Sequence, residues 1–481
     1  MRQSRVGRQA PFQMKGEDKG MKKVFVKSYG CQMNAYDSER MIESLAAMQY
    51  RQVDEPEQAD MVILNTCHIR EKAAEKLFSD LGRFYQMKQA RQKAGQQSIL
   101  TVAGCVAQAE GEEIQRRAPY VDIVVGPQAY HRLPEMIRHY QESAAVPTLG
   151  KKMVLDTSFP LESKFDHLPQ HRLGKGVVAF LTVQEGCDKF CTFCVVPYTR
   201  GGEVSRPVQS ILVEAKDLVK GGAKEIILLG QNVNAYHGLA PSGIATWGLA
   251  RLLLELAEID GLQRLRYITS HPLDMGDDLI QAHGQISMLM PYLHLPVQSG
   301  SDKILKQMNR RHNTADYEKV IDKIRSVRPG LALSSDFIVG FPGETQKDFE
   351  ETLSFIKKIT YAQAYSFKYS PRPGTPAANH DQQISEELKD QRLQELQFLL
   401  DQQQYQFNQQ MVGQELMVLL EKKSRQPHQV HGRSPHMQLV HVEASEDLIG
   451  QMVRVRVDQA NSHSLGGKLV SYPHREGAHH A

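Results

Sequence analysis

Short apolar runs and helix-like segments alternate along the first 120 residues. Each run is rich in β-branched residues, and in the segment that follows it apolar positions recur at the spacing of one helix face. The runs cover 23–31, 61–67 and 98–105, and the helix-like segments cover 37–48, 69–84 and 110–118. Because helices cover both faces of a sheet built in this way, the pattern predicts a parallel α/β sheet domain.

A second series of strands and helices occupies the middle of the chain. Strand-like runs lie at 179–184, 225–230, 265–269, 291–297, 331–340 and 364–370, with amphipathic helices such as 208–222 and 345–359 between them. These are about six strand-helix units, fewer than the eight of a closed barrel. The pattern therefore predicts a partial parallel barrel with its active site at the carboxyl ends of the strands.

After Gly413 the pattern changes to short strands without helices between them. Five runs, at 415–421, 428–433, 437–443, 451–458 and 468–472, predict a small all-β barrel of the oligonucleotide-binding type. Alternation in the fourth run puts Arg454 and Arg456 on one face and Val453, Val455 and Val457 in the core. Such a basic face suits phosphate contacts, although solvated arginines on a half-buried strand give the same pattern.

Length and composition agree with a three-domain protein. The chain has 481 residues, 41% of them apolar and 23% charged, and the net charge of +3 permits a nucleic-acid partner. The expected divisions are a disordered tail at 1–21, the α/β domain at 22–140, a linker at 141–172, the partial barrel at 173–406 and the small barrel at 407–475. Without an apolar run of 18 residues or a secretory signal, we expect a cytoplasmic protein with no membrane partner.

Three of the six cysteines are widely spaced, at Cys31, Cys67 and Cys105, and each ends one of the three N-terminal strand runs. The carboxyl ends of parallel strands share one edge of a sheet, so these thiols can meet in space near helix N-termini. Three thiolates there would suit an iron-sulfur cluster. The alternative is three buried cysteines that act as small apolar residues.

The other three, Cys187, Cys191 and Cys194, fall within eight residues of one loop. A zinc site would need a fourth ligand, such as His171 or His271. A four-iron cluster held by three thiolates instead keeps one iron open. The spacing, with Phe193 as the aromatic residue, resembles the motif of the radical S-adenosylmethionine (radical SAM) enzymes, in which that cofactor occupies the open iron.

Motifs along most of the chain, from about Lys22 to Leu469, resemble the bacterial MiaB-type tRNA methylthiotransferases. The segments that carry the resemblance are 30–34, 65–73, 104–108, 185–207, 294–301, 336–345 and 369–377. His68 departs from the pattern, because Ser is frequent at that position in the subfamily. The resemblance implies a methylthiotransferase domain, a radical SAM barrel and a C-terminal RNA-binding TRAM domain, with two [4Fe-4S] clusters and S-adenosyl-L-methionine as cofactors.

The same resemblance implies roles for individual residues. Cys31, Cys67 and Cys105 would hold the auxiliary cluster and Cys187, Cys191 and Cys194 the radical cluster, with no catalytic residues beyond these ligands. Candidate contacts to S-adenosylmethionine are Phe193, Gln298, Ser299, Ile338, Gly340 and Gly343. Candidate contacts to RNA are Arg200, Arg206, Arg454 and Arg456, and Glu203 stands beside the first two.

The implied reaction places a methylthio group on C2 of N6-isopentenyladenosine at position 37 of tRNA, beside the anticodon. The C–H bond at C2 is strong and its proton is not acidic, so a radical cofactor is needed to break it. The implied partners are tRNA and an electron donor such as a flavodoxin or ferredoxin. Two alternatives stay open: methylthiolation of a ribosomal-protein aspartate or of threonylcarbamoyladenosine in tRNA, and a non-enzymatic RNA-binding protein with structural metal clusters.

Overall fold

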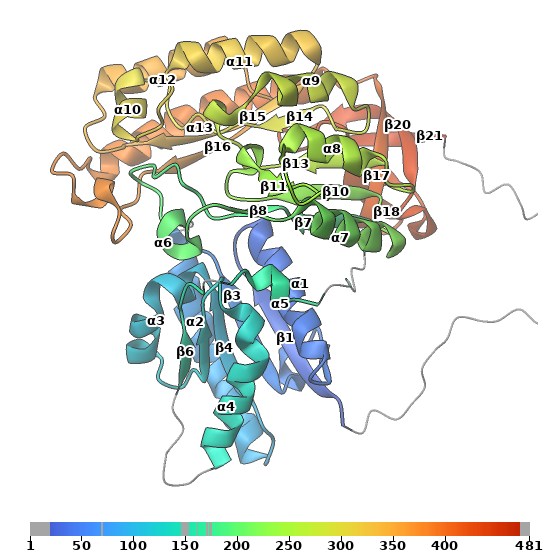
Figure 1. The fold of residues 1–481 in the computed structure, drawn as a ribbon. Helices are drawn as coiled ribbons and strands as arrows, with labels where there is room; N and C mark the ends of the chain where they lie inside the picture. Colours follow the sequence, from blue (N-terminus) through green and yellow to red (C-terminus); the bar gives the residue numbers. More distant parts are fainter. Residues whose placement is uncertain are drawn as a thin grey trace, which may run out of the picture.

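The computed structural model describes residues 20–68, 71–145, 153–160, 162–169, 172 and 176–471. Residues 1–19 of the expected tail, part of the expected linker and His171 lie outside this range. The described chain forms three bodies, with the N-terminal domain below the central barrel and the C-terminal barrel at its side (Figure 1). Among the described helices, none combines the length and apolar character needed to cross a bilayer.

The N-terminal domain is a six-stranded parallel sheet with the strand order β2-β1-β3-β4-β5-β6. Its strands are β1 (Lys22–Ser28), β2 (Tyr50–Gln52), β3 (Met61–Thr66), β4 (Ile99–Gly104), β5 (Ile123–Val125) and β6 (Val154–Asp156). Its helices are α1 (Gln32–Ala46), α2 (Glu71–Lys93), α3 (Cys105–Arg117) and α4 (Leu133–Ala145). All six residues of β3 and of β4 are buried, which explains their continuous apolar runs. The expected parallel α/β sheet is confirmed, and β6 extends it beyond the expected boundary at residue 140.

The central domain has six parallel strands in two groups, β13-β10-β7 and β14-β15-β16. They are β7 (Val178–Thr182), β10 (Glu225–Leu229), β13 (Arg264–Tyr267), β14 (Tyr292–His294), β15 (Ala332–Val339) and β16 (Gln363–Lys368). A bridge between Leu265 and Leu289 joins the groups. The covering helices are α7 (Val208–Lys220), α8 (Leu249–Ala257), α9 (Asp277–Gln285), α10 (Asp302–Gln307), α11 (Thr314–Val327), α12 (Gln346–Ile359) and α13 (Glu386–Gln409). The prediction of a partial six-unit barrel is confirmed.

Several short elements lie around the mouth of this barrel or connect the domains. They are α5 (Lys164–His167), α6 (Val196–Arg200), β8 (Gln184–Glu185), β9 (Val204–Ser205), β11 (His237–Leu239) and β12 (Thr246–Gly248). β8 pairs with β9, so the chain before and after the clustered cysteines is joined by backbone hydrogen bonds. In Figure 1, α6 stands between the barrel and the N-terminal domain.

The C-terminal domain is a closed five-stranded barrel with the order β17-β18-β19-β21-β20. Its strands are β17 (Glu415–Lys423), β18 (Gln429–Arg433), β19 (Leu439–Glu443), β20 (Met452–Ala460) and β21 (Ser464–Ser471). Val453, Val455 and Val457 are fully buried, whereas Arg454 and Arg456 are exposed. The alternation predicted for this strand is therefore confirmed.

Two buried arginines of β13 fix the C-terminal barrel to the central domain. The Arg264 guanidinium donates to the carbonyls of Met417 and Arg433, at 2.6 and 2.8 Å. Arg266 donates to the carbonyls of Ser434 and Pro435, at 2.9 and 2.8 Å. Glu225 compensates their charge, since its carboxylate lies 3.0 Å from the Arg266 Nε. The C-terminal barrel thus sits at the amino ends of the barrel strands, opposite the loops that carry the cysteines.

Candidate functional site

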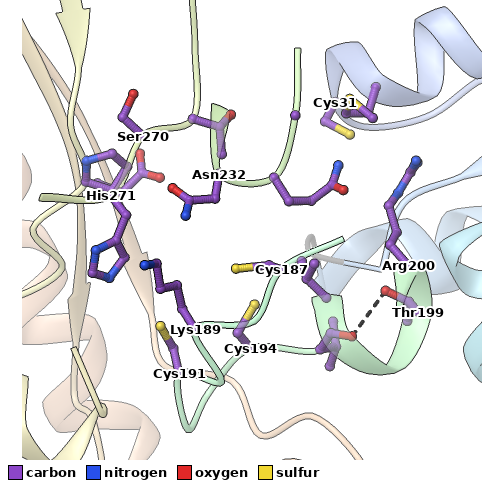
Figure 2. A pocket seen from close by; sticks show the side chains of 18 of the residues that line it. Cys31, Cys187, Lys189, Cys191, Cys194, Thr199, Arg200, Asn232, Ser270 and His271 are labelled. Atoms are coloured by element: carbon purple, nitrogen blue, oxygen red, sulfur yellow. Dashed lines mark hydrogen bonds between the residues drawn. The ribbon is translucent and has the colours of Figure 1, made fainter. Parts of the chain in front are cut away.

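All six cysteines line one cavity between the N-terminal domain and the central barrel. The cavity has a volume of about 250 Å³, and each of the six thiols is free of disulfide bonds. Figure 2 shows Cys187, Cys191 and Cys194 on the barrel loop, with Cys31 facing them from the N-terminal domain. The structure therefore brings together not only the three scattered cysteines but both sets of three.

The strand order of the N-terminal sheet places the scattered cysteines side by side. Cys31 follows β1, Cys67 follows β3 and Cys105 follows β4, and these three strands are neighbours. Gly30 has φ +112°, and a Cβ atom there would lie 2.2 Å from the Cys67 Cβ. Gly104 has φ +90°, and a Cβ there would lie 2.4 Å from the Asn65 Oδ1. Only glycine permits these close approaches of the strand ends.

The environment of the scattered cysteines favours negative charge at one thiol. A hydrogen bond with Cys67 lowers the pKa of the Cys31 thiol to about 6, against the effect of burial and with help from the Arg200 charge. Burial raises the pKa of Cys105, and Arg200 opposes this by charge and hydrogen bonding. Because thiolates are the ligands of iron-sulfur clusters, a cationic side chain at this point suits a cluster site.

The clustered cysteines lie on a tight loop after β8. Gly186 begins it with φ +76°, and a Cβ there would lie 1.9 Å from the Gly202 carbonyl oxygen. The side-chain amide of Asn309 donates to the Phe190 carbonyl at 2.9 Å and holds the far side of the loop. Burial raises the pKa of the Cys187 thiol to about 11 and that of Cys194 to about 12. These thiols are protonated at neutral pH unless a metal cluster takes the place of the protons.

One wall of the cavity carries polar atoms that lack hydrogen-bond partners within the described chain. They are the Asn232 Oδ1, the Ser270 Oγ, the His271 Nε2 and the Arg310 Nε. The Asp274 carboxylate accepts from the Asn232 Nδ2 at 2.8 Å, so the Asn232 oxygen is left for a ligand. The His271 Nδ1 accepts from the Leu273 amide at 3.2 Å, which leaves the proton on Nε2. A ligand with both donors and acceptors fits this wall.

The residues and cavity fit iron-sulfur chemistry. Three thiols on one loop beside a cavity that also contains unsatisfied polar atoms are what a cluster with a chelating cofactor requires. Arg310 lies close to this loop, with its Nη1 3.6 Å from the Cys191 Sγ. Among the described residues, no three His, Cys, Asp or Glu side chains converge as ligands of a single metal ion.

The expected cofactor contacts are divided between the cavity and its surroundings. Phe193 and Gln298 line the cavity, and Ile338 packs in the same apolar cluster as Phe193. The Ser299 hydroxyl bonds to the Thr352 Oγ1 at 3.2 Å and is not among the lining residues. A Cβ at Gly340 would meet Lys389, and one at Gly343 would meet Gln382, so these two glycines also pack outside the cavity.

The four expected RNA contacts lie in two different environments. Arg454 and Arg456 are exposed, and both approach the Glu415 carboxylate, at 3.8 and 2.7 Å. Arg200 and Arg206 are buried in ion pairs, with side chains only 3% and 6% exposed, so neither is available on the surface for RNA phosphates. Carboxylates of other segments compensate both charges. Glu203 lies 3.2 Å from the His237 ring.

Sequence reasoning missed several side chains of the cavity wall. Asn232, Lys189, Ser270 and Arg310 carried no separate signal as ligand contacts, and His271 was considered only as a fourth ligand of a zinc site. Their common feature is that they follow barrel strands or adjoin the cysteine loop. The positive φ of Thr269, +70°, marks one of these turns in the structure but is invisible in the sequence.

Three family models match the chain in the order of its domains. Residues 23–126 match an uncharacterized protein family named UPF0004, residues 181–356 match the radical SAM superfamily, and residues 409–470 match the TRAM domain. The barrel and its cysteine loop thus define a radical SAM enzyme, a class that uses a [4Fe-4S] cluster and S-adenosylmethionine.

A relative from Jannaschia sp. (strain CCS1), named tRNA-2-methylthio-N(6)-dimethylallyladenosine synthase, is 58% identical over 449 residues. The match covers 93% of this chain and 94% of the relative. The chain belongs to this family of tRNA methylthiotransferases.

Two solved structures of cobalamin-dependent or cobalamin-bound radical S-adenosylmethionine enzymes share the fold at low identity. OxsB has a TM-score of 0.51 and 14% identity, covering 79% of this chain and 56% of OxsB. TsrM from Kitasatospora setae has a TM-score of 0.54 and 12% identity, covering 74% of this chain and 77% of TsrM. At these identities the likeness concerns the fold alone.

Proposed function

We propose that the enzyme methylthiolates C2 of N6-isopentenyladenosine at position 37 of tRNA and that both sets of cysteines hold [4Fe-4S] clusters. The observation that carries the proposal is the single cavity lined by all six thiols. A reaction that joins C–H cleavage to sulfur transfer needs two chemical centres within reach of one base. The high identity to a relative named for this product supports the choice of substrate.

In this proposal each set of three has one task. Cys187, Cys191 and Cys194 would hold the cluster needed for reductive cleavage of S-adenosylmethionine, and Cys31, Cys67 and Cys105 would hold the cluster needed as a source of sulfur. When bound, these groups provide hydrogen abstraction at an unactivated carbon and a methylated sulfur for transfer. The protein provides the ligands and the fixed spacing between them.

The polar wall orients the ligands in the cavity. The Asn232 Oδ1 accepts and the His271 Nε2 donates, so together they match a group that carries both functions. Burial and the nearby Arg310 hold the pKa of His271 well below its usual range, which keeps its ring neutral at physiological pH. Phe193 supplies an apolar surface at the same cavity for a ring.

The target base must be splayed out of the RNA loop to enter this cavity. A base in the anticodon loop is unpaired, so splaying it out costs less than extruding a base from a duplex. Arg454 and Arg456 on the C-terminal barrel are the residues proposed to contact the RNA backbone. Reduction of the radical cluster requires an electron donor, for which a flavodoxin or ferredoxin is proposed on the basis of the family resemblance.

Nucleoside mass spectrometry tests the proposal directly. tRNA is taken from cells that lack the gene and from the same cells complemented with wild type or with Cys67→Ala. Methylthio-isopentenyladenosine is expected to return only with wild type. An unchanged level of that nucleoside in the deletion would contradict the proposed substrate and favour threonylcarbamoyladenosine or a ribosomal protein instead.

A further inference from the structure

A buried group of four charged side chains adjoins the cavity that the cysteines line, through one of its members, Arg200. We call Arg200, Lys164, Asp37 and Glu185 the buried charge cluster; their side chains are only 1–3% exposed. Arg200 reaches the Asp37 Oδ2 at 2.7 Å and the Glu185 Oε1 at 2.5 Å. Lys164 reaches the same two carboxylates, at 3.6 and 2.7 Å. Two cations and two anions thus compensate one another away from solvent.

Three of the four members come from segments that carry the cysteines, and the fourth, Lys164, begins α5. Asp37 is in α1, the helix that begins directly after Cys31. Glu185 ends β8, two residues before Cys187, and Arg200 ends α6, six residues after Cys194. Arg200 therefore ties the N-terminal domain to both sides of the clustered loop.

Arg200 differs from the other three members because it also faces the cavity. It lines the cavity with the cysteines, whereas Lys164, Asp37 and Glu185 do not. Its Nη2 also donates to the Asn34 Oδ1 at 3.2 Å, and that oxygen lies 3.6 Å from the Cys31 Sγ. Figure 2 shows the side chain rising from α6 toward Cys31. A buried positive charge in this position acts on the scattered cysteines through a medium that screens it weakly.

We propose that Arg200 is a positioning residue that fixes the two sets of cysteines relative to each other and whose charge raises the reduction potential of a cluster held by Cys31, Cys67 and Cys105. This rests on the proposed function, since it requires the second cluster. Reduction adds an electron to the cluster, and a fixed cation nearby stabilises the more negative state. Asp37, which accepts from the same Arg200 Nη2 at 2.7 Å, has the opposite sign and opposes this effect.

The first test is a redox titration of the scattered-cysteine cluster, followed by electron paramagnetic resonance. The full-length chain is used with Cys187, Cys191 and Cys194 changed to Ala, so that one cluster is observed alone. Arg200→Met is expected to lower the equilibrium constant for one-electron reduction at least tenfold, a shift of about 59 mV to lower potential. Arg200→Lys keeps the charge and is expected to retain most of the potential. Asp37→Asn is expected to shift the potential in the opposite direction.

Arg206→Met is the matched control. Arg206 is also a buried arginine between the same domains, but it pairs with Glu214 at 2.7 Å and does not line the cavity. Arg206→Met is expected to weaken the interface between the two domains without changing the reduction potential of the cluster. Equal shifts in Arg206→Met and Arg200→Met, or shifts of the same sign in Arg200→Met and Asp37→Asn, would overturn the electrostatic role.

A second readout tests the positioning role in the chain with both sets of cysteines intact. The ratio of methylthiolated base to cleaved S-adenosylmethionine is expected to fall at least tenfold in Arg200→Met. It is expected to remain unchanged in Arg206→Met. An unchanged ratio in Arg200→Met would overturn this role. If the chain without the clustered cysteines binds no iron at all, the second cluster of the proposed function is refuted. If it binds a cluster whose reduction potential does not change in Arg200→Met, only the role of Arg200 is refuted.

Discussion

The scattered cysteines depend on glycine at the strand ends that carry them. Gly30 adopts φ +112° and leaves no space for a Cβ beside Cys67, and Gly104 does the same beside Asn65. A side chain at either position strains the backbone, and one at Gly30 also collides with Cys67. The geometry of the three thiols is thus set in part by glycines that supply no ligand atom themselves.

Gly30→Ala is expected to remove the iron of one cluster while the other is retained. The left-handed backbone alone costs about 1–2 kcal/mol for an alanine, and the overlap with Cys67 adds to it. Iron analysis of the purified protein measures the loss. Gly95→Ala is the control, because Gly95 also has positive φ, +73°, but nothing lies within 4 Å of an added Cβ. Equal iron loss in both variants would contradict the explanation.

Cys67→Ala and Cys191→Ala are expected to separate the two tasks of the cysteines. The first variant should still form deoxyadenosine from S-adenosylmethionine but yield no methylthiolated base, because the clustered loop is intact. The second should lose both. Chromatography of the two products in one reaction is the measurement, and loss of cofactor cleavage in Cys67→Ala would refute the division.

At the residue scale the sequence predicted the cysteines better than their surroundings. Cys31, Cys67 and Cys105 each end an apolar run, so sheet topology alone brings them together. Arg200 was predicted only as a candidate RNA contact, and its burial in an ion pair was not predicted, because charged residues are mostly exposed. Its partner Asp37 is 163 residues away in sequence, and no local pattern reveals such a pair.

At the scale of elements, β20 shows how one strand serves both a core and a surface. Its valines fill the C-terminal barrel, while Arg454 and Arg456 are exposed and both approach the Glu415 carboxylate. Such strands could be predicted because alternation has a period of two, and the five strands of this barrel were found. The closing contact between β19 and β21, which is parallel, has no signal in the sequence.

Changing Arg454 and Arg456 together to Ala is expected to weaken tRNA binding and to reduce its salt dependence. Each lost contact with a phosphate of a single strand lowers the slope of log affinity against log salt by about 0.7. Glu415→Gln is expected to act in the opposite direction, since it frees both arginines. Affinity measured over a range of salt concentrations checks this, and an unchanged slope in the double variant would remove these residues from the RNA interface.

At the scale of the whole molecule, a second ionic group joins the N-terminal domain to the central barrel. Glu214 of α7 accepts from Arg206 at 2.7 Å and from Arg172 at 2.5 Å, and Tyr36 of α1 donates to it at 3.2 Å. Burial alone would raise the pKa of the Glu214 carboxyl, but Arg206 and Arg172, with Arg40, lower it to about 2. The interface is therefore sensitive to acid.

Stability is expected to fall as the pH drops from about 4.5 toward 2. A carboxyl with a lowered pKa stabilises the folded state above its unfolded pKa, and this contribution is lost as it is protonated. Glu214→Gln should remove on the order of 3 kcal/mol at neutral pH and flatten the acid dependence. Thermal unfolding measured against pH tests this, and parallel curves for the variant and wild type would contradict it.

The contacts of the C-terminal barrel with Arg264 and Arg266 fix its distance from the cavity that the cysteines line. β10 runs from Glu225, which pairs with Arg266, to Leu229, which lines the cavity. A strand of this length spans roughly 15 Å. We expect this fixed distance to select among the bases of an RNA bound to the C-terminal barrel, because only a base at the matching distance can enter the cavity. In an RNA loop that is longer by one nucleotide, we expect the neighbouring base to enter the cavity instead.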